Sequence, residues 1–257
     1  MFNAFRNKDH TFRSKLGFEK DQDGILKRYL GETDAWAPHL DRTKAAVMDQ
    51  SATKSKTKAA ILGSGWLLDI PLDELASLFS ELWLFDIRHP FQIKKQVSKH
   101  NNVKLVETDI SGLALSISNL AHKKSPEISL SSLIPAFDFD LSEFDYIVSC
   151  NLLNQLDIIL MDYLSEHIRI TTEEEIMLRR HIQQTHLQLL PPNKSCLIAD
   201  TEEIWLNKKN EMSGKKQLIF TDLPEKGVLD QWIWYFDNHY TYHPHCKTWL
   251  KVSAIQL

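Results

Sequence analysis

The stretch Ala59-Ala60-Ile61-Leu62-Gly63-Ser64-Gly65 indicates the fold class of this chain. Four consecutive apolar residues are typical of a buried strand, and the two glycines allow a turn whose backbone can approach a ligand closely. Further apolar runs follow at residues 82–85, 103–106, 144–150 and 195–199. Helix-like segments separate these runs. Such alternation predicts βαβ units, right-handed crossovers and a parallel sheet.

The predicted fold is a Rossmann-like, doubly wound α/β domain with a mostly parallel sheet. We expect the fifth strand to end at Asp200. Strand-like stretches at residues 217–221, 231–236 and 248–255 then predict antiparallel C-terminal strands at one edge of the sheet. Residues 1–57 are predicted to form an N-terminal helical appendage and linker, so the α/β domain is placed at residues 58–257.

Composition narrows the classes of function. The 257 residues are 43% hydrophobic and 25% charged with a net charge of -4, which is typical of a globular protein without a general nucleic-acid footprint. The three cysteines form no CxxC pair, which favours a reducing cytoplasm. No apolar run reaches the roughly 18–20 residues of a membrane span, and the N-terminus lacks a signal-peptide core. We therefore expect no membrane partner; the oligomeric state is not predicted.

Small or hydrogen-bonding residues follow four of the predicted strands. Gly63 to Gly65 follow the first strand, Asp86 closes the second, Asp109 closes the third and Asn151 follows the fourth. A parallel sheet binds ligands beyond the carboxyl ends of its strands, at the point where the strand order reverses. A carboxylate after the second strand can accept hydrogen bonds from a ribose diol, and one after the third from an exocyclic amine.

These motifs, Ile61 to Gly65, Leu84 to Asp86, Glu107 to Ile110 and Phe144 to Asn151, resemble those of class I S-adenosylmethionine-dependent methyltransferases. The stretch from Leu62 to Leu72 also resembles uncharacterised bacterial methyltransferase-like proteins. The resemblance implies S-adenosylmethionine as cofactor and a small-molecule methyl acceptor. It further implies the positions of the cofactor contacts. The glycine turn would face the methionine moiety, the acid after the second strand would hold the ribose, the end of the third strand would contact adenine, and the end of the fourth would lie near the methionine. The residues implied as cofactor contacts are, in chain order, Gly63, Ser64, Gly65, Asp86, Ile87, Asp109, Ile110, Cys150 and Asn151.

The sequence also departs from this family. An acid usually stands two residues before the first glycine, where this chain has Ile61, and Leu67 replaces a common third glycine. The motif Asn151-Leu152-Leu153-Asn154 differs from Asn-Pro-Pro-Tyr, which argues against methylation of nucleic-acid amino groups. A catalytically degenerate binding module on the same fold stays open as an alternative. A nicotinamide-dinucleotide dehydrogenase is a further alternative, but Leu68 stands where its fingerprint needs glycine.

Other residues have structural interpretations. Asp69, just before Pro71, is interpreted as a helix cap, with a contact to the cofactor's amino group as the second possibility. His186 is interpreted as a structural histidine, and Trp232, Trp234 and Trp249 as core residues. Trp36 and His39 are expected in the core, or in a lid over the cleft. The cluster His239, His243, His245 and Cys246 lacks the spacing of a metal site, so no metal is predicted. No catalytic base is assigned.

Overall fold

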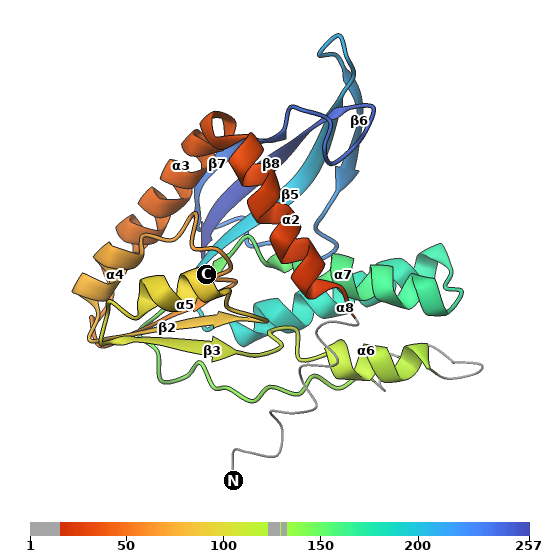
Figure 1. Cartoon of the computed structure of the whole chain (residues 1–257). Coiled ribbons are helices and arrows are strands. Elements are labelled where there is room, and N and C mark those ends of the chain that lie inside the picture. The colour runs from red at the N-terminus through yellow and green to blue at the C-terminus, as the bar shows by residue number, and fades with distance from the viewer. Residues whose placement is uncertain (1–15, 123–128, 130–132) are drawn as a thin grey trace.

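The computed structural model describes residues 16–122, 129 and 133–257, and it is built around an eight-stranded sheet (Figure 1). The strands are β1 (Lys58–Leu62), β2 (Glu81–Asp86), β3 (Val103–Glu107), β4 (Tyr146–Cys150), β5 (Ser195–Leu206), β6 (Met212–Gln217), β7 (Val228–Asp237) and β8 (Lys247–Gln256). They lie in the order β3-β2-β1-β4-β5-β8-β7, and β6 pairs with the distal half of β5.

The first five strands form the parallel part of this sheet. Strand β1 pairs in parallel with β2 on one side and β4 on the other, and β3 and β5 extend the sheet outward. The chain therefore reverses its direction of winding between β1 and β4, which is where a doubly wound sheet binds its ligand. The predicted Rossmann-like, mostly parallel fold is confirmed.

The C-terminal strands complete the sheet in antiparallel fashion, as predicted. Strand β8 runs antiparallel to β5, and β7 runs antiparallel to β8. Two details of the prediction were wrong. Strand β5 continues beyond Asp200 to Leu206, because its distal half pairs with both β8 and β6. The strand expected at residues 217–221 is replaced by β6, which ends at Gln217. The sequence did not indicate β6, because its exposed residues have no apolar pattern and it forms through its hairpin with β5.

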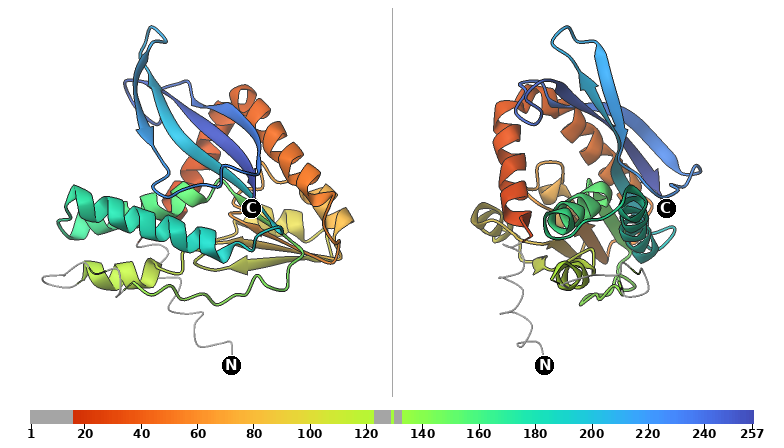
Figure 2. Two further views of the ribbon diagram at one scale, coloured as in Figure 1. Left: turned by 180° about the vertical axis from the view of Figure 1, so that it is seen from behind. Right: turned by 90° about the vertical axis from the view of Figure 1, so that its right-hand side faces the viewer.

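Helices cover both faces of the sheet (Figure 2). They are α2 (Phe18–Gly31), α3 (Thr33–Ser51), α4 (Leu72–Leu78), α5 (Phe91–Val97), α6 (Ala114–Ala121), α7 (Leu153–His167) and α8 (Thr172–Leu189). One core contains side chains of α3, α4 and α5, and the other contains side chains of α6, α7 and α8. Alternate residues of β1 enter the two cores, Ala60 and Leu62 in one and Ala59 and Ile61 in the other, which explains its unbroken apolar run. Across the described ranges, no helix is long and apolar enough to cross a membrane.

Helix α3 of the N-terminal segment packs on strand β7, far away in sequence. Trp36 is 1% exposed, its ring stacks on Phe236, and its indole N–H donates to the Phe236 carbonyl oxygen at 2.9 Å. The hydroxyl of Tyr146 in β4 donates to the carbonyl of Val47 at 2.8 Å. These contacts join α3 to the α/β domain. The predicted boundary after residue 57 stays a prediction.

Trp36→Ala is expected to destabilise the protein by about 3–5 kcal/mol, because it removes a buried indole and leaves a cavity between α3 and β7. Leu30→Ala on α2 is the control: this side chain is 68% exposed, so a change within about 0.5 kcal/mol is expected. Urea unfolding of both variants measures the difference. Equal stability of the two variants would show that α3 is not docked as described.

Candidate functional site

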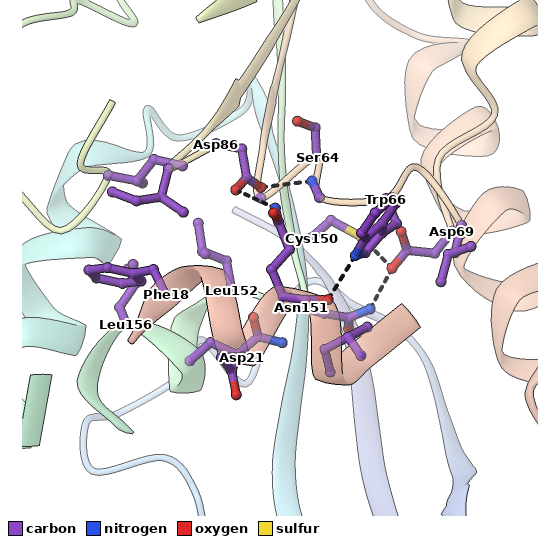
Figure 3. Close-up of a pocket in the computed structure, with 18 of the residues that line it drawn as sticks. Phe18, Asp21, Ser64, Trp66, Asp69, Asp86, Cys150, Asn151, Leu152 and Leu156 are labelled. Atoms are coloured by element: carbon purple, nitrogen blue, oxygen red, sulfur yellow. Dashed lines mark hydrogen bonds between the residues drawn. The ribbon is translucent and has the colours of Figure 1, made fainter. Parts of the chain in front are cut away.

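A cavity lies at the carboxyl ends of β1, β2, β3 and β4, at the reversal of strand order. Figure 3 shows Phe18 and Leu156 toward one end of it and Trp66 and Asp69 toward the other. All nine residues predicted as cofactor contacts line this cavity: Gly63, Ser64, Gly65, Asp86, Ile87, Asp109, Ile110, Cys150 and Asn151. The structure therefore brings them together, while their role in binding stays a prediction.

The glycine turn after β1 is held tightly between β2 and β4. The Gly63 amide donates to the Phe85 carbonyl at 3.0 Å. Gly63 has φ 79°, and a Cβ atom there would lie 2.8 Å from the carbonyl oxygen of Cys150. A side chain at residue 63 is therefore excluded by both conformation and space, so the backbone itself forms this wall of the cavity.

Asp86 ends β2 and is 8% exposed. Its Oδ2 accepts a hydrogen bond from the Gly65 amide at 2.7 Å, and its Oδ1 accepts one from Gln22 Nε2 at 3.2 Å. Burial raises the pKa of the Asp86 carboxyl to about 6, while backbone donors, Gly65 first, oppose that rise. A carboxylate with an oxygen engaged by a neutral amide can exchange that partner for a hydroxyl of a ligand.

Asp109 also lies on the cavity wall, but its carboxylate is bound within its own turn. Oδ1 accepts from the amide and hydroxyl of Ser111 at 2.9 and 2.6 Å, and Oδ2 accepts from the Ala114 amide at 3.0 Å. These bonds fix the turn that begins α6. Ile87 and Ile110 line the same part of the cavity with apolar surface. The expected adenine contact of Asp109 stays a prediction, because Oδ1 already accepts two hydrogen bonds and only Oδ2 could accept another.

The cavity wall at the end of β4 brings together Asp69, Cys150 and Asn151. Asp69 is not a helix cap, because α4 begins after Pro71 and no side chain caps it. Instead, Asp69 Oδ2 accepts from Asn151 Nδ2 at 2.7 Å and from Cys150 Sγ at 3.3 Å. Burial raises the pKa of the Asp69 carboxyl and that of the Cys150 thiol. The thiol is therefore a neutral donor rather than a nucleophile.

A second buried acid lies behind this wall. Asp200 in β5 is 2% exposed and does not line the cavity. Burial first, and then the negative charge of Asp69, raise its pKa to about 7, against the opposing effect of a hydrogen bond from Asn154. Among the described residues, Asp200 Oδ1 has no hydrogen-bond partner. Asp200 is thus a buried carboxyl that is mostly protonated below about pH 7.

The helical appendage supplies cavity residues that the sequence did not identify. Gln22 of α2 reaches Asp86, and Trp66 Nε1 donates to the Gln22 carbonyl at 2.7 Å. The helix itself was recognisable from its apolar spacing. Its position over the strand ends was not, because that position depends on contacts between α3 and the distant strand β7.

Aromatic side chains of α3 and β7 form part of the cavity wall. His39 stacks on Trp234 with ring centroids 3.8 Å apart and accepts from Trp232 Nε1 at 3.0 Å. Burial lowers the pKa of His39 to about 3, so the imidazole is neutral. Trp36 and Trp234 belong to the core and also line the cavity. Trp36 and His39, which were expected either in the core or over the cleft, are thus buried side chains that also form part of the cavity wall.

The remaining candidates have structural roles. His186 is buried, its pKa is lowered to about 4 by burial, and its Nε2 lies 2.8 Å from the Ser149 hydroxyl. Trp249 is half-buried and packs on Tyr235 outside the core, so its expected core position was wrong. His239 and His243 contact different carboxylates, Glu32 and Glu203. Within the described ranges, no group of three or more His, Cys, Asp or Glu side chains is placed to hold a metal ion.

The charge of the cavity is one-sided. The described residues that line it include four aspartates, Asp21, Asp69, Asp86 and Asp109, and no lysine or arginine. Most of the remaining wall is apolar or aromatic. The cavity measures about 130 Å³. The cavity is therefore small. Because its only charged side chains are acidic among the described residues, it suits uncharged or cationic groups rather than phosphates.

No protein-family model and no curated protein sequence matches the chain. Among solved structures, it is similar to Burkholderia thailandensis 1,6-didemethyltoxoflavin-N1-methyltransferase with bound 1,6-didemethyltoxoflavin and S-adenosylhomocysteine (9% identity, TM-score 0.43, 96% of this chain and 90% of that one). It is also similar to Bradyrhizobium japonicum N-methyltransferase NodS with S-adenosylhomocysteine (10%, 0.36, 83% and 85%) and to a DhpI-SAM-HEP complex (9%, 0.39, 92% and 96%). At such identities and TM-scores, these similarities assign neither a family nor a function.

The Asp200 carboxyl makes stability depend on pH. It keeps its proton up to about pH 7 in the folded protein, against a reference pKa of 3.8. The folded state then binds more protons than the unfolded chain between these values, so stability falls as pH rises through this window. Asp200→Asn, which cannot ionise, is expected to be more stable than the wild type at pH 8 by roughly 2–4 kcal/mol.

Urea unfolding at pH 4 and pH 8 tests this expectation. The advantage of Asp200→Asn should disappear at pH 4, where the wild-type carboxyl is also neutral in the folded state. Asp41→Asn is the control, because Asp41 is exposed on α3 and has no ion pair among the described residues. A constant difference between Asp200→Asn and the wild type at both pH values would contradict a raised pKa at Asp200.

Proposed function

We propose that this protein binds S-adenosylmethionine in the cavity and transfers its methyl group to a small-molecule acceptor. One observation carries the proposal: four strand ends that are far apart in sequence place a glycine turn, Asp86, Ile87, Ile110 and Asn151 around one cavity at the reversal of strand order. A nucleoside attached to an amino acid is complementary to these groups. Its ribose diol matches Asp86, its purine matches the apolar side chains of Ile87 and Ile110, and its polar end matches Asn151.

The residues fit such a ligand in three respects. Asp86 Oδ1 is positioned to accept a ribose hydroxyl in place of the Gln22 amide. The side-chain-free turn at Gly63 lets the backbone lie against the ligand. Asn151 is 7% exposed and its Oδ1 has no partner among the described residues, so this buried acceptor gains a hydrogen bond when a donor enters.

When bound, S-adenosylmethionine supplies a methyl group that is already activated by the sulfonium. The protein's part is to hold donor and acceptor in line and to exclude water, and a base is needed only where the acceptor must lose a proton. The mostly apolar cavity, which α2 partly covers, serves this purpose. We assign no catalytic base. The three cysteines are free, in keeping with a reducing cytoplasm as the proposed compartment.

Dinucleotide binding is a weaker alternative. A pyrophosphate needs the N-terminus of the helix that follows the glycine turn. Helix α4 begins only at Leu72, and its first turn carries Asp73 and Glu74, whose charges repel phosphate. No lysine or arginine stands among the described cavity residues to compensate. The geometry therefore favours S-adenosylmethionine over a nicotinamide dinucleotide.

Titration calorimetry with S-adenosylhomocysteine tests the proposal, and NADH serves as the competing ligand. We expect saturable binding of the former. Asp86→Ala should weaken it by about 1–3 kcal/mol, roughly 5- to 150-fold, because the ribose hydroxyls lose their acceptor. Asp73→Ala, on the surface of α4, should bind like the wild type. A folded wild type that binds neither ligand would favour the degenerate binding module, and binding of NADH alone would favour the dehydrogenase.

Helix α2 lies over the proposed site. The Gln22 side chain bonds both Asp86 Oδ1 and the Arg88 carbonyl, at 3.2 and 3.0 Å. The cavity volume of about 130 Å³ is below the roughly 300–1000 Å³ of common ligand pockets. We infer that α2 shifts when the cofactor binds and that the Gln22 amide must then leave Asp86.

Gln22→Ala is expected to raise the affinity for S-adenosylhomocysteine by roughly three- to tenfold, because one hydrogen bond no longer competes for Asp86. Lys27→Ala, an exposed change on the same helix, is the control for effects on helix α2 itself. Calorimetry measures both. Weaker binding by Gln22→Ala would mean that Gln22 contacts the ligand instead of competing with it.

A further inference from the structure

A chain of polar groups runs from β7 through α3 to the cavity wall. Trp232 Nε1 donates to His39 Nδ1 at 3.0 Å, and His39 Nε2 lies 3.3 Å from Asn151 Nδ2. Asn151 Nδ2 in turn donates to Asp69 Oδ2 at 2.7 Å. Trp232, His39 and Asn151 are buried. Because water does not supply their partners, the protons of this chain must fit one another.

The direction of hydrogen bonding is fixed at Trp232. An indole nitrogen can only donate, so His39 Nδ1 is the unprotonated nitrogen of its ring. Burial lowers the pKa of His39 to about 3, so the neutral ring carries its single proton on Nε2. The Nε2–H group of His39 therefore faces Asn151 Nδ2, and two donors meet. Asn151 Oδ1, meanwhile, is buried without a hydrogen-bond partner in the described ranges.

Turning the Asn151 amide over exchanges these partners. The oxygen and nitrogen of an amide have nearly the same shape, and their positions are decided by the hydrogen bonds that they make. In the turned orientation, Oδ1 accepts from His39 Nε2 and also lies beside Asp69 Oδ2. Two oxygens form a hydrogen bond only with a proton between them, so Asp69 must then be protonated. The two orientations of one amide thus correspond to the two protonation states of one acid.

The groups packed around Asp69 favour its protonated form in an empty cavity. Burial raises the pKa of its carboxyl, and the charge of Lys44 on α3 only partly opposes that rise. Cys150 of β4 is a neutral donor at 3.3 Å. Asp200 of β5 is close enough for the two acids to repel each other when both are ionised. A positive charge in the cavity shifts this balance toward the ionised form of Asp69.

We propose that Asp69, Asn151 and His39 together distinguish the charged cofactor from its uncharged product. In the empty protein Asp69 is protonated and the Asn151 amide is turned toward His39. A cationic ligand drives the proton from Asp69 into solvent and sets the amide in the orientation described above. The effect acts through charge and requires no contact between Asp69 and the ligand.

The proposal rests on the proposed function for the identity of the ligand. S-adenosylmethionine carries a sulfonium, and S-adenosylhomocysteine carries a neutral thioether in its place. The sulfonium compound therefore releases more of the Asp69 proton than the thioether does. Its affinity relative to that of the thioether then rises with pH, by at most about tenfold per pH unit for one proton.

The test is titration calorimetry of the full chain with both nucleosides between about pH 6 and pH 8, in buffers of different ionisation enthalpy. The heats give the number of protons released. We expect the wild type to release more protons with S-adenosylmethionine than with S-adenosylhomocysteine. Asp69→Asn should abolish this difference, and Asp200→Asn should retain it, because Asp200 does not line the cavity.

Trp232→Phe tests the hydrogen-bond chain itself. Trp232 does not line the cavity, so its loss leaves the ligand contacts in place. Without the indole donor, His39 is free to hold its proton on Nδ1 and to accept from Asn151 Nδ2 through Nε2. Asp69 then ionises more readily, and the pH dependence of the affinity ratio should shift downward by roughly half a unit to one unit. Trp249→Phe, a half-buried change outside the cavity, is the matched control and should behave like the wild type.

Equal proton release by the two nucleosides in the wild type overturns the proposal. So does a difference that persists in Asp69→Asn, or a folded Trp232→Phe whose pH dependence matches that of Trp249→Phe. Nitrogen NMR of His39 in the free wild type needs no variant. A proton on Nε2 is expected, and a proton on Nδ1 would contradict the chain.

Failure of the proposed function gives a different pattern, in which the wild type binds neither nucleoside. Carbon NMR of the free protein then decides the coupling between Asp69 and its neighbours. The Asp69 carboxyl is expected to titrate at a lower pH in Trp232→Phe than in the wild type. An unchanged titration would overturn the coupling, and thermal unfolding checks that each variant is folded.

Discussion

The site depends on the parallel pairing of β1 with both β2 and β4. Because these three strands point the same way and are in register, they end at one rim, where the turn at Gly63 lies against the Cys150 carbonyl. The contact leaves no space for a Cβ atom. Asp86, Asp109 and Asn151 gain their positions from the same alignment. A shift of one residue in any of these strands would turn its end away from the cavity.

The N-terminal helices partly cover this rim. Trp36 and His39 of α3 pack on Trp234 of β7, and this aromatic contact sets where α2 crosses the strand ends. Enclosure has electrostatic consequences. Removed from water, Asp86 and Asp200 have raised pKa values, and His39 has a lowered one. Asp86 on the cavity wall and Asp200 behind it are therefore acids that respond to a ligand's charge, and the imidazole on the same wall contributes no charge.

This arrangement suits a reaction in which the protein mainly aligns its ligands. The glycine turn and Asp86 would hold a nucleoside at the carboxyl ends of β1 and β2. Because the binding groups along the cavity would fix the ligand's direction, its reactive atom would be placed without a dedicated catalytic side chain. The absence of a recognisable catalytic motif in the sequence is compatible with such a division of labour.

The sequence by itself determined the strands up to the fifth, their parallel pairing and the residues at four strand ends, since buried parallel strands appear as unbroken apolar runs and end at one rim. It did not reveal β6, whose polar residues carry no apolar pattern, or the full length of β5, whose distal half exists through pairing with β6 and β8. Only the tertiary structure decided that Gln22 and Trp66 contact each other over the cavity, and that Asp69 turns toward Asn151 instead of capping α4. These features arise from contacts between elements far apart in sequence, and such contacts leave no local periodicity to read.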